Sequence, residues 1–466
     1  MFLKGRCRGV IVQNKKAGCM SEKNIPGLVV RQVCARLLSV VLDKHKSLSG
    51  LTDHEYGHPH YLKLSHRDRL LCRAILITAL RHRGQITAAL SRFLKRPLPL
   101  QALSLQHLLH ISAAQILYLD IPDHAAIDLA VQIAKIDPRT RRFSGLVNAI
   151  LRNFAREAVS LRMQEPTIKD VPAWFGQLLV STYGVDKAHQ ILAMQNKAPS
   201  LDLTVKSDSV GWARQLGGIV LPNGSIRLDA LDGPIVNLPG YAQGAWWVQD
   251  FAAALPACLL GDIRGKRVVD FCASPGGKTA QLALQGADVT AVESSVNRLE
   301  RLKENMNRLH LSAHYWAGDM RDFYSEQLFD AVLLDAPCSS TGTIRRHPDI
   351  LWTKSSDDII KLTALQYDLL LTAIAFVKKG GRIIFSNCSL ARQEGEDLIE
   401  KILSTRDDIV LEPILAEEMG SMKHLLSADG TLRTTPADCC YGNCDIKDPL
   451  LFGMDGFFAA RLRKVA

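Results

Sequence analysis

The sequence predicts a multidomain protein, with an all-α bundle in its front half and an α/β sheet domain in its back half. Its 466 residues exceed the usual size of one compact domain. Apolar residues recur at helical spacing through most of residues 26–160. From residue 241 onward, apolar runs of strand length alternate with helical segments, which is typical of a mostly parallel, doubly wound sheet.

Changes in composition divide the chain into four expected parts. They are a basic tail at 1–25, a helical domain at 26–160, a small α+β linker subdomain at 161–240 and the sheet domain at 241–466. Short strands in the linker are expected at 201–205, 218–221 and 225–228. Strands in the sheet domain are expected at 266–272, 288–293, 331–334, 382–386 and 456–462, with helices at 277–285, 296–309 and about 357–378. Gly380 and Gly381 are expected to form the turn into strand 382–386.

Positive charge is concentrated in the front half. Residues 1–170 hold 27 Lys and Arg against 12 Asp and Glu, a net of +15, whereas the whole chain carries +10 and residues 171–466 therefore carry −5. A basic module joined to a mildly acidic domain indicates a polyanion-binding part attached to an enzyme. The arginines expected to be exposed and to contact phosphates are Arg67, Arg69, Arg81, Arg83, Arg139, Arg141 and Arg142.

The cysteines and the hydropathy indicate a reduced, intracellular protein. There are eleven cysteines, without a secretory signal pattern or an apolar run as long as a membrane span, so we expect a cytoplasmic protein that does not bind membranes. We also expect a monomer. Cys439, Cys440 and Cys444 form the densest group. The sequence gives them no second pair and no nearby histidine at ligand spacing, so we expect no metal.

The first segment that carries chemistry joins the predicted strand at 266–272 to the helix that follows. It reads Asp270-Phe271-Cys272-Ala273-Ser274-Pro275-Gly276-Gly277-Lys278-Thr279. The glycines let a ligand approach the backbone closely, and a helix N-terminus offers N–H groups to an anion. A Walker loop would need a further glycine upstream, and the dinucleotide fingerprint is absent. In a methyltransferase, the anion would be the carboxylate of the methionine part of the cofactor.

Two acids follow the next predicted strands. Glu293 ends the strand at 288–293, roughly 20 residues past the glycines, where an acid typically accepts hydrogen bonds from a ribose hydroxyl pair. Asp319 follows Gly318 after another short strand, where an acid could hold an adenine amino group. Taken with the glycine loop, the two acids predict a nucleoside-containing cofactor at this edge of the sheet.

Two cysteines follow predicted strands that should end beside a transferred methyl group. Cys338 lies in Asp335-Ala336-Pro337-Cys338-Ser339, and Cys388 lies in Ser386-Asn387-Cys388-Ser389-Leu390. Methyltransferases that act on amino groups commonly have an aromatic residue where Cys338 stands, so this cysteine indicates carbon methylation of a pyrimidine.

The chemistry explains the need for a thiol. Carbon 5 of cytosine is too electron-poor to attack a methyl sulfonium, and a thiolate that adds to carbon 6 turns the ring into a nucleophilic enamine. A base then removes the carbon-5 proton and the thiolate leaves. Asp335 could bind the ring edge, while Lys278 and a cationic cofactor would favour the thiolate. The spacing of the motifs does not show which cysteine attacks.

These motifs resemble the RsmB (Fmu/Sun) branch of the RNA cytosine-5 methyltransferases, from about residue 26 to the end of the chain. In the front half the resemblance to a NusB-like RNA-binding bundle rests on residues 124–131 (HAAIDLAV) and 146–154 (LVNAILRNF). In the back half it rests on the segments already described and on Gln249-Asp250, Arg346-His347-Pro348-Asp349 and Asp455-Gly456-Phe457-Phe458.

The resemblance implies a Rossmann-like methyltransferase domain that uses S-adenosylmethionine and modifies small-subunit (16S) ribosomal RNA. It implies that Cys388 is the nucleophile, that Cys338 assists product release and that Asp335 contacts the cytosine. The implied cofactor contacts are Cys272, Ala273, Ser274, Pro275, Gly276, Gly277, Lys278, Glu293, Asp319 and Asp335. The chain departs from the family pattern at Ser274, where alanine is usual, at Asn387, where threonine is usual, and at 201–205, which lacks Arg-x-Asn.

Two other functions compete with this interpretation. A DNA cytosine-5 methyltransferase would carry a Glu-Asn-Val motif after Cys338 and a large target-recognition insert, and the sequence has neither. A non-catalytic RNA-binding assembly factor would not need Cys388, Cys338 and Asp335, and all three are present.

Overall fold

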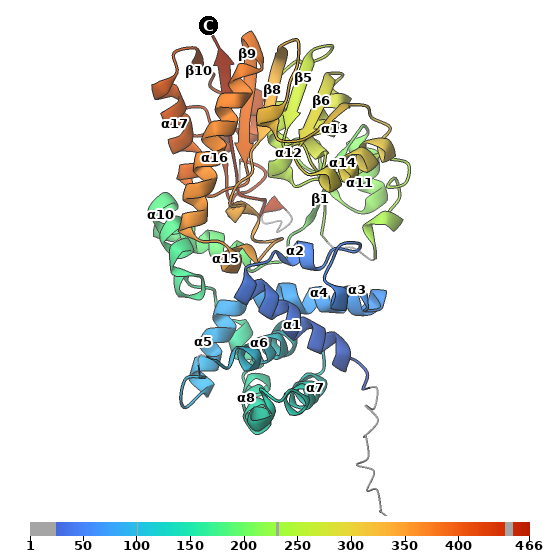
Figure 1. Ribbon diagram of the computed structural model, residues 1–466, viewed down its shortest axis with the longest axis vertical. Helices are drawn as coiled ribbons and strands as arrows, with labels where there is room; N and C mark the ends of the chain where they lie inside the picture. The colour runs from blue at the N-terminus through green and yellow to red at the C-terminus, as the bar shows by residue number, and fades with distance from the viewer. Residues whose placement is uncertain (1–24, 100, 230–232, 443–450) are drawn as a thin grey trace, which may run out of the picture.

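The computed structural model describes residues 25–99, 101–229, 233–442 and 451–466. A helical part lies below a sheet-containing part in Figure 1, and the long axis of the molecule runs through both. Residues 1–24 of the predicted basic tail lie outside the described residues. The expected combination of an N-terminal all-α bundle and a C-terminal α/β domain is confirmed.

The helical part is built around helix α6, because nearly all of its side chains from Leu105 to Leu117 are buried. Helices α1, α4, α7 and α8 pack against it and bury their apolar faces there. The helices are α1 (Leu28–Lys44), α2 (Leu48–Leu51), α3 (Pro59–Leu62), α4 (His66–Arg81), α5 (Arg83–Phe93), α6 (Leu103–Tyr118), α7 (Asp123–Ile136), α8 (Ser144–Arg156) and α9 (Ala158–Arg162), with 3-10 turn η1 (Arg141–Phe143).

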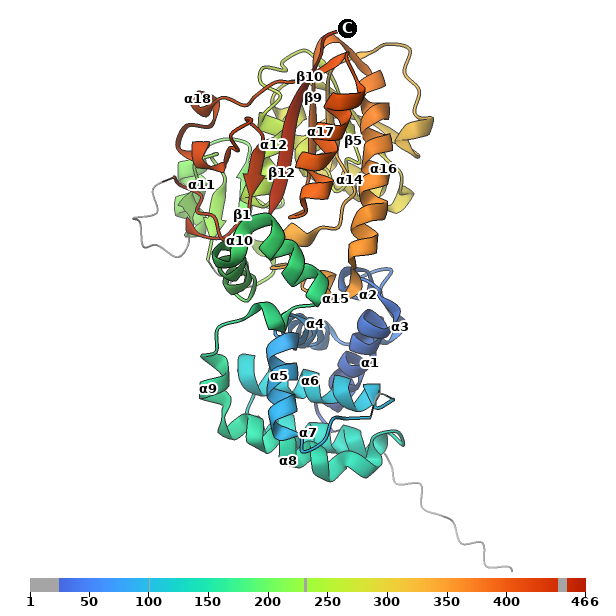
Figure 2. The same cartoon turned by 90° about the vertical axis from the view of Figure 1, so that its left-hand side faces the viewer.

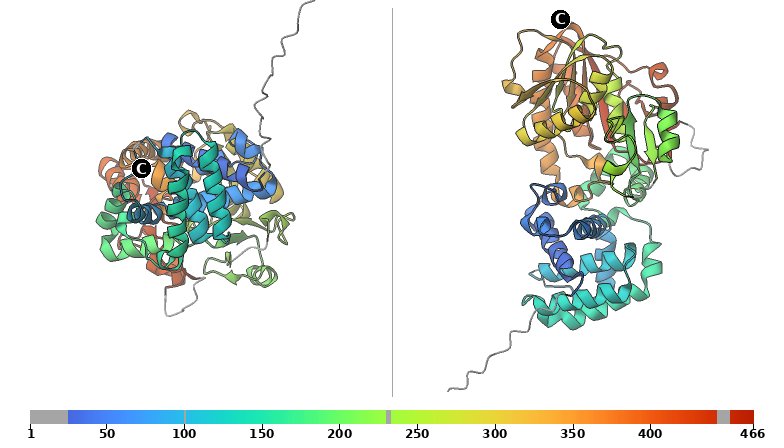
Figure 3. Two further views of the ribbon diagram at one scale, coloured as in Figure 1. Left: turned by 90° about the horizontal axis from the view of Figure 1, so that it is seen from below. Right: turned by 90° about the vertical axis from the view of Figure 1, so that its right-hand side faces the viewer.

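Residues 201–248, which cross the expected boundary at 240, form an antiparallel sheet beside the large one (Figure 3). Its strands, in the order β2-β3-β1-β4, are β1 (Leu201–Val205), β2 (Ile219–Val220), β3 (Ile226–Leu228) and β4 (Trp246–Val248). The three expected strands are confirmed, whereas β4 and the long helix α10 were not expected. The other elements are η2 (Ile168–Asp170), α10 (Ala173–Gln195), α11 (Ser209–Leu216) and η3 (Ile235–Asn237). Asp202, where the family pattern differs, is buried and accepts hydrogen bonds from the Arg227 guanidinium at 2.6 and 2.7 Å.

The large sheet has the strand order β10-β12-β9-β8-β5-β6-β7, with β11 paired to β12. Strands β9, β8, β5, β6 and β7 are parallel, and β12 runs antiparallel to β9, so the sheet is mostly parallel as expected. Its strands are β5 (Arg267–Phe271), β6 (Asp288–Glu293), β7 (His314–Ala317), β8 (Phe329–Asp335), β9 (Val377–Asn387), β10 (Ile409–Leu411), β11 (Leu432–Thr434) and β12 (Phe457–Lys464).

Helices cover both faces of this sheet. Side chains of α12 and α13 pack on one face, and those of α16 and α17 pack on the other. The helices are α12 (Phe251–Cys258), α13 (Gly277–Leu284), α14 (Val296–Arg308), α15 (Ile350–Thr353), α16 (Ser356–Ala375), α17 (Glu396–Thr405) and α18 (Ala416–Met419). The 3-10 turns are η4 (Met320–Asp322), η5 (Thr341–Thr343), η6 (Arg392–Glu394) and η7 (Gly420–Leu425). Among the helices of the described ranges, none combines the length and the apolar character that a bilayer span requires.

The expected turn at Gly380 and Gly381 is wrong, because both glycines lie inside β9. The strand begins at Val377, and α16 ends at Ala375. Gly380 has φ +79°, and the pairing with β8 shifts in register between Phe329 and Ala331, so the glycines form an irregularity within the strand. A Gly-Gly pair usually indicates a strand boundary in a sequence. The sequence alone does not show that β8 pairs with β9 on both sides of the glycines and so continues the strand through them.

Residues 344–353 of the sheet domain, which include α15, contact the helical part. Helix α15 lies at the junction of the two parts in Figures 1 and 2. The Asp349 carboxylate accepts a hydrogen bond from the Leu48 N–H at 2.9 Å. The Trp352 indole N–H donates to the Leu80 carbonyl at 2.9 Å. Asp349, the last residue of the segment Arg346-His347-Pro348-Asp349, therefore belongs to a domain contact, whereas Arg346 pairs with Asp455 within the sheet domain.

Two of the arginines predicted to contact phosphates belong to this contact instead. Arg81 donates to the Arg345 carbonyl at 2.8 Å, and the Arg83 guanidinium lies 5.3 Å from the centre of the Trp352 ring. The prediction that these two are exposed is wrong, because charge on a helix surface does not show which domain covers it. Arg67, Arg139, Arg141 and Arg142 are exposed as expected, whereas Arg69 is half-buried.

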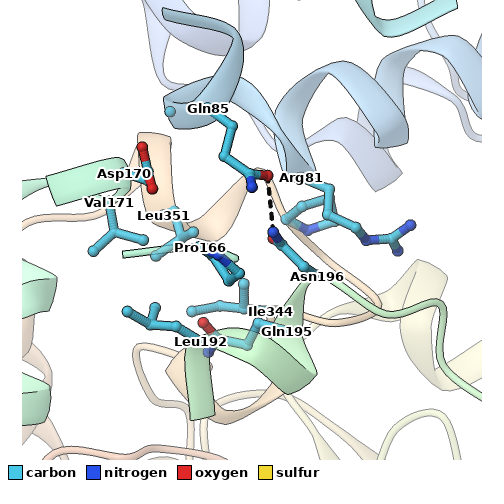
Figure 4. A pocket seen from close by; sticks show the side chains of 12 residues that line it. Arg81, Gln85, Pro166, Asp170, Val171, Leu192, Gln195, Asn196, Ile344 and Leu351 are labelled. Carbon is cyan, nitrogen blue, oxygen red and sulfur yellow. Dashed lines mark hydrogen bonds between the residues drawn. The ribbon is translucent and has the colours of Figure 1, made fainter. Parts of the chain in front are cut away.

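A small cavity of about 20 Å³ lies at the same junction (Figure 4). Gln85 of α5 accepts a hydrogen bond from Asn196 at 2.9 Å across it. Its volume matches about one water molecule, so it has room for a solvent molecule but not for a nucleotide.

Candidate functional site

The predicted site residues gather at the carboxyl ends of the parallel strands. The chain ends just after β12, at the top of Figure 1, and β12 is antiparallel to β9, so the parallel strands run down toward the helical part. Strand β5 is flanked by β8 on one side and β6 on the other, which makes it the point where the strand order reverses. In doubly wound sheets, ligands bind at this point, beyond the strand ends.

The glycine loop leaves β5 and enters α13. Gly276 has φ +100°, and a Cβ atom there would lie 3.0 Å from Cγ of Leu302. The loop is tied to its surroundings, because Ser274 Oγ donates to the Arg298 carbonyl and Asn305 Nδ2 donates to the Pro275 carbonyl, both at 2.9 Å. The unusual Ser274 thus has a structural partner, and the two hydrogen bonds hold the loop against α14.

Asp270, at the end of β5, was not among the predicted site residues. Its side chain is fully buried and accepts a hydrogen bond from Thr279 Oγ1 at 2.6 Å, which connects the two ends of the loop. Burial raises the pKa of Asp270 to about 7. The sequence shows an acid at this position, but not that it is turned inward.

Glu293 lies directly beside the loop. Its carboxylate is buried and accepts hydrogen bonds from the backbone N–H groups of Ser274 at 3.3 Å and Ser295 at 3.0 Å. Arg298 forms an ion pair with it at 3.4 Å. The structure therefore brings Glu293 and the loop together, as the strand pattern predicts.

Asp319 follows β7 and forms an ion pair with Arg321. Its carboxylate accepts from the side-chain Nε and Nη2 of Arg321 at 2.9 and 2.5 Å. The Arg321 hydrogen bond lowers the pKa of Asp319 to about 2, so the group is a carboxylate at neutral pH. Arg321 was not predicted, and its position two residues after Asp319 is the signal that could have identified it.

Asp335 and Lys278 form an ion pair between the loop and the cysteine-bearing strands. Lys278 Nζ lies 2.7 Å from Asp335 Oδ2, and Ser386 Oγ donates to Asp335 Oδ1 at 3.0 Å. The same Nζ lies 4.9 Å from the centre of the Phe457 ring. Asp335 is thereby held at the junction of β5, β8 and β9.

The two cysteines face each other, with Sγ of Cys338 and Sγ of Cys388 only 3.4 Å apart. The hydrogen bond from Cys338 lowers the pKa of Cys388, and the positive charge of Lys278 acts in the same direction. The pKa of Cys338 is raised well above its ordinary value by the same pairing, by burial and by the charge of Glu394. The arrangement favours a thiolate on Cys388 that accepts a hydrogen bond from the Cys338 thiol.

The third group of cysteines lies elsewhere. Cys439 and Cys440 are buried in the core beside α12, and Cys444 lies outside the described residues. Within the described ranges, no cluster of three or more His, Cys, Asp or Glu side chains is arranged to hold a metal ion.

Known families match both halves of the chain. The model of 16S rRNA methyltransferase RsmB/F matches residues 257–463, and the model of the NusB family matches residues 29–156. Ribosomal RNA small subunit methyltransferase B of Salmonella arizonae is 30% identical over 419 residues, which cover 86% of this chain and 96% of the relative. The same-named protein of Salmonella enteritidis PT4 is 32% identical over 401 residues, with 82% and 91% covered.

Two crystal structures share the fold. That of PH0851 has a TM-score of 0.67 at 21% identity and covers 94% of this chain and 99% of its own. That of NSun6 from Pyrococcus horikoshii with SFG has a TM-score of 0.50 at 18% identity and covers 63% of this chain and 98% of its own.

Proposed function

Because the chain belongs to the family of ribosomal RNA small subunit methyltransferase B, we propose that it methylates carbon 5 of a cytidine in 16S ribosomal RNA through a covalent cysteine adduct. The observation that carries this proposal is the pair of sulfurs 3.4 Å apart at the ends of β8 and β9. Methyl transfer to an amino group or a hydroxyl requires no thiol, whereas carbon 5 of a pyrimidine requires a nucleophile on the neighbouring carbon.

The methyl donor is S-adenosylmethionine, and the residues beyond β5 and β6 fit it. When bound, it supplies a methyl group on a positively charged sulfur. The cradle at Gly276, where a Cβ would meet Leu302 at 3.0 Å, allows close approach to the backbone, and the first N–H groups of α13 would bind the carboxylate. Glu293 would accept from a ribose hydroxyl, and Asp319 would hold the adenine amino group while it shares its charge with Arg321.

Three residues of the chain, Cys388, Asp335 and Cys338, would each have a separate role in the reaction. Cys388 Sγ forms a bond to carbon 6 of the ring, and the displaced electron pair makes carbon 5 nucleophilic. Asp335 binds the ring edge and is held in place by Lys278 and Ser386. After methyl transfer, a base accepts the carbon-5 proton with the assistance of Cys338, the electron pair of the carbon–hydrogen bond restores the ring double bond, and Cys388 leaves carbon 6 as a thiolate. The base must leave its stack to reach both sulfurs.

The helical part would bind the RNA backbone. Arg67, Arg139, Arg141 and Arg142 are exposed on it and can contact phosphates without reading the sequence. The catalytic strand ends point toward this part of the molecule, so one RNA could contact both. A ribosomal RNA substrate places the activity in the cytoplasm.

The test of this function is the fate of the methyl group. We expect tritium from labelled S-adenosylmethionine to enter 16S rRNA, and nucleoside analysis of the digested product to find it in 5-methylcytidine. Duplex DNA of matched cytosine content is the control and should stay unlabelled. Label in the DNA alone would support the DNA enzyme, and label in any other RNA nucleoside would contradict the proposed chemistry.

The Gly276→Val variant is expected to weaken binding of S-adenosylhomocysteine at least about tenfold, a loss of about 1.4 kcal/mol. A β-branched residue at φ +100° strains the loop, and its Cβ would press on Leu302. Isothermal titration measures the change. Gly265→Val is the matched control, because Gly265 also has positive φ (+68°) but lies before β5, at the other end of the strand, where a Cβ atom would meet none of the described atoms within 4 Å. Equal affinities in the two folded variants would remove Gly276 from the cofactor site.

A further inference from the structure

A buried acid that the proposed chemistry does not use lies behind the two cysteines. Glu394 ends the 3-10 turn η6 and has no exposed surface. Its Oε1 accepts hydrogen bonds from the Ser339 N–H at 2.9 Å and from Gln366 Nε2 at 2.8 Å. Its Oε2 accepts from the hydroxyls of Ser339 and Ser389, both at 2.5 Å. Four donors on one carboxylate suit its ionised, acceptor-only form.

The hydrogen bonds of Glu394 and of its partner Gln366 involve the residues directly before and directly after each cysteine. Ser339 and Ser389 directly follow Cys338 and Cys388, and both donate to Glu394. On the preceding side, the Pro337 carbonyl accepts from Gln366 Nε2 at 2.8 Å, and Asn387 Nδ2 donates to the Glu394 carbonyl at 2.5 Å.

The flanks of the cysteines are therefore joined through Glu394 and its partner Gln366, while the two sulfurs face each other. The unusual Asn387 takes part in this connection, since its Oδ1 also accepts from the Ser389 N–H at 3.0 Å. In this buried network both oxygens of the Glu394 carboxylate are satisfied, and among its described side-chain atoms only Gln366 Oε1 has no partner, so the bonds hold the two cysteine loops in one arrangement.

The negative charge of Glu394 affects the pKa of one cysteine more than that of the other. It raises the pKa of Cys338, whereas Lys278 lowers the pKa of Cys388. The charge of Asp335 raises the pKa of Cys388, and the ion pair of Asp335 with Lys278 at 2.7 Å offsets part of this effect. The hydrogen bond between the two sulfurs, together with the negative charge of Glu394 behind Cys338, favours a single proton arrangement, with the proton on Cys338.

We propose that Glu394 is a positioning residue that holds the two cysteine loops together and determines that Cys388, and not Cys338, carries the thiolate. The proposal rests on the covalent mechanism proposed above and deepens it. Glu394 touches neither base nor cofactor. It acts through Ser339 and Ser389, and through its charge, on the two sulfurs.

The test compares Glu394→Gln with wild type by limited alkylation. Glutamine keeps the size of the side chain and removes its charge. Substoichiometric iodoacetamide modifies whichever sulfur is the thiolate, and peptide mass spectrometry gives the ratio of label on Cys388 to label on Cys338. We expect wild type to label mainly Cys388, and Glu394→Gln to lower this ratio at least fivefold. We also expect single-turnover methyl transfer to fall at least tenfold, with the affinity for S-adenosylhomocysteine unchanged.

Two further variants make the result interpretable. Glu412→Gln removes a partly buried acid that pairs with Arg382 at the other end of β9, and it should keep both the labelling ratio and the rate. Ser339→Ala removes one donor to Glu394 and should shift the ratio in the same direction by a smaller factor, which provides the test if Glu394→Gln does not fold. An unchanged ratio in both folded variants would overturn the proposal. The ratio is measured without RNA, so a wild-type enzyme that methylates no cytidine would contradict the proposed function and leave this test intact.

Discussion

The Cys388→Ala variant is expected to lose methyl transfer by a factor on the order of 10⁴ or more, and to form no covalent RNA adduct. Without the thiol, nothing adds to carbon 6, and carbon 5 remains too electron-poor to attack the sulfonium. Cofactor affinity should change little, because Cys388 is at the end of β9 and the glycine loop follows β5. Single-turnover tritium incorporation and isothermal titration measure the two effects.

The matched control is Cys258→Ala, which removes an exposed cysteine at the end of α12 and should keep full activity. Activity retained in Cys388→Ala at a tenth of the wild-type rate or more would exclude this residue as the nucleophile. Loss of cofactor binding together with activity would show instead that the substitution disturbs the site as a whole.

The Cys338→Ala variant is expected to accumulate an RNA-linked species that survives denaturing gel electrophoresis. Cys388 can still attack and methylate, but the carbon-5 proton is removed slowly, so the product stays attached. Formation of the species should need the Cys388 thiol, and the double variant should therefore show none.

The pH dependence of this trapping follows from the contact between the two thiols. The hydrogen bond from Cys338 lowers the pKa of Cys388, so its loss in Cys338→Ala raises that pKa and reduces the thiolate fraction at neutral pH. The adduct should then form faster as the pH rises toward 9, in a series of quenched reactions analysed on gels. An adduct in Cys388→Ala and none in Cys338→Ala would show that the two roles are reversed. It would favour the arrangement of the DNA cytosine methyltransferases, whose nucleophile is the cysteine after the earlier proline, the position of Cys338 here.

Much of the fold follows from local patterns that the sequence contains. Strands β1 and β6 lie where the sequence predicts them, because a short run with β-branched residues that begins shortly after Pro199 or Gly286 and ends shortly before serines favours a strand. The positions of Glu293, Asp319 and both cysteines could be predicted for a related reason. Each follows a strand, and the carboxyl ends of parallel strands meet at one edge of a sheet.

What could not be predicted depends on contacts between segments distant in sequence. Arg81 and Arg83 have the helix positions of surface residues, and only the docked segment 344–353 shows that they are covered. Arg321 partly compensates the charge of Asp319 by forming an ion pair with it. The two residues are two positions apart, which permits this contact but does not require it. Glu394 follows no strand of its own, so it is identified only when four donors from three segments are seen to meet on its carboxylate.

The most direct test of the covalent mechanism is to trap the enzyme on 16S rRNA transcribed with 5-fluorocytidine. Fluorine on carbon 5 cannot leave as a proton, so an enzyme attached through carbon 6 stays attached after methyl transfer. Trypsin cleaves after Arg382 and Arg392, so Cys388 lies on a peptide that does not contain Cys338. The account predicts that mass spectrometry will find the nucleotide on the peptide that contains Cys388. A nucleotide on the peptide of Cys338, or methylated RNA with no linked peptide, would contradict it.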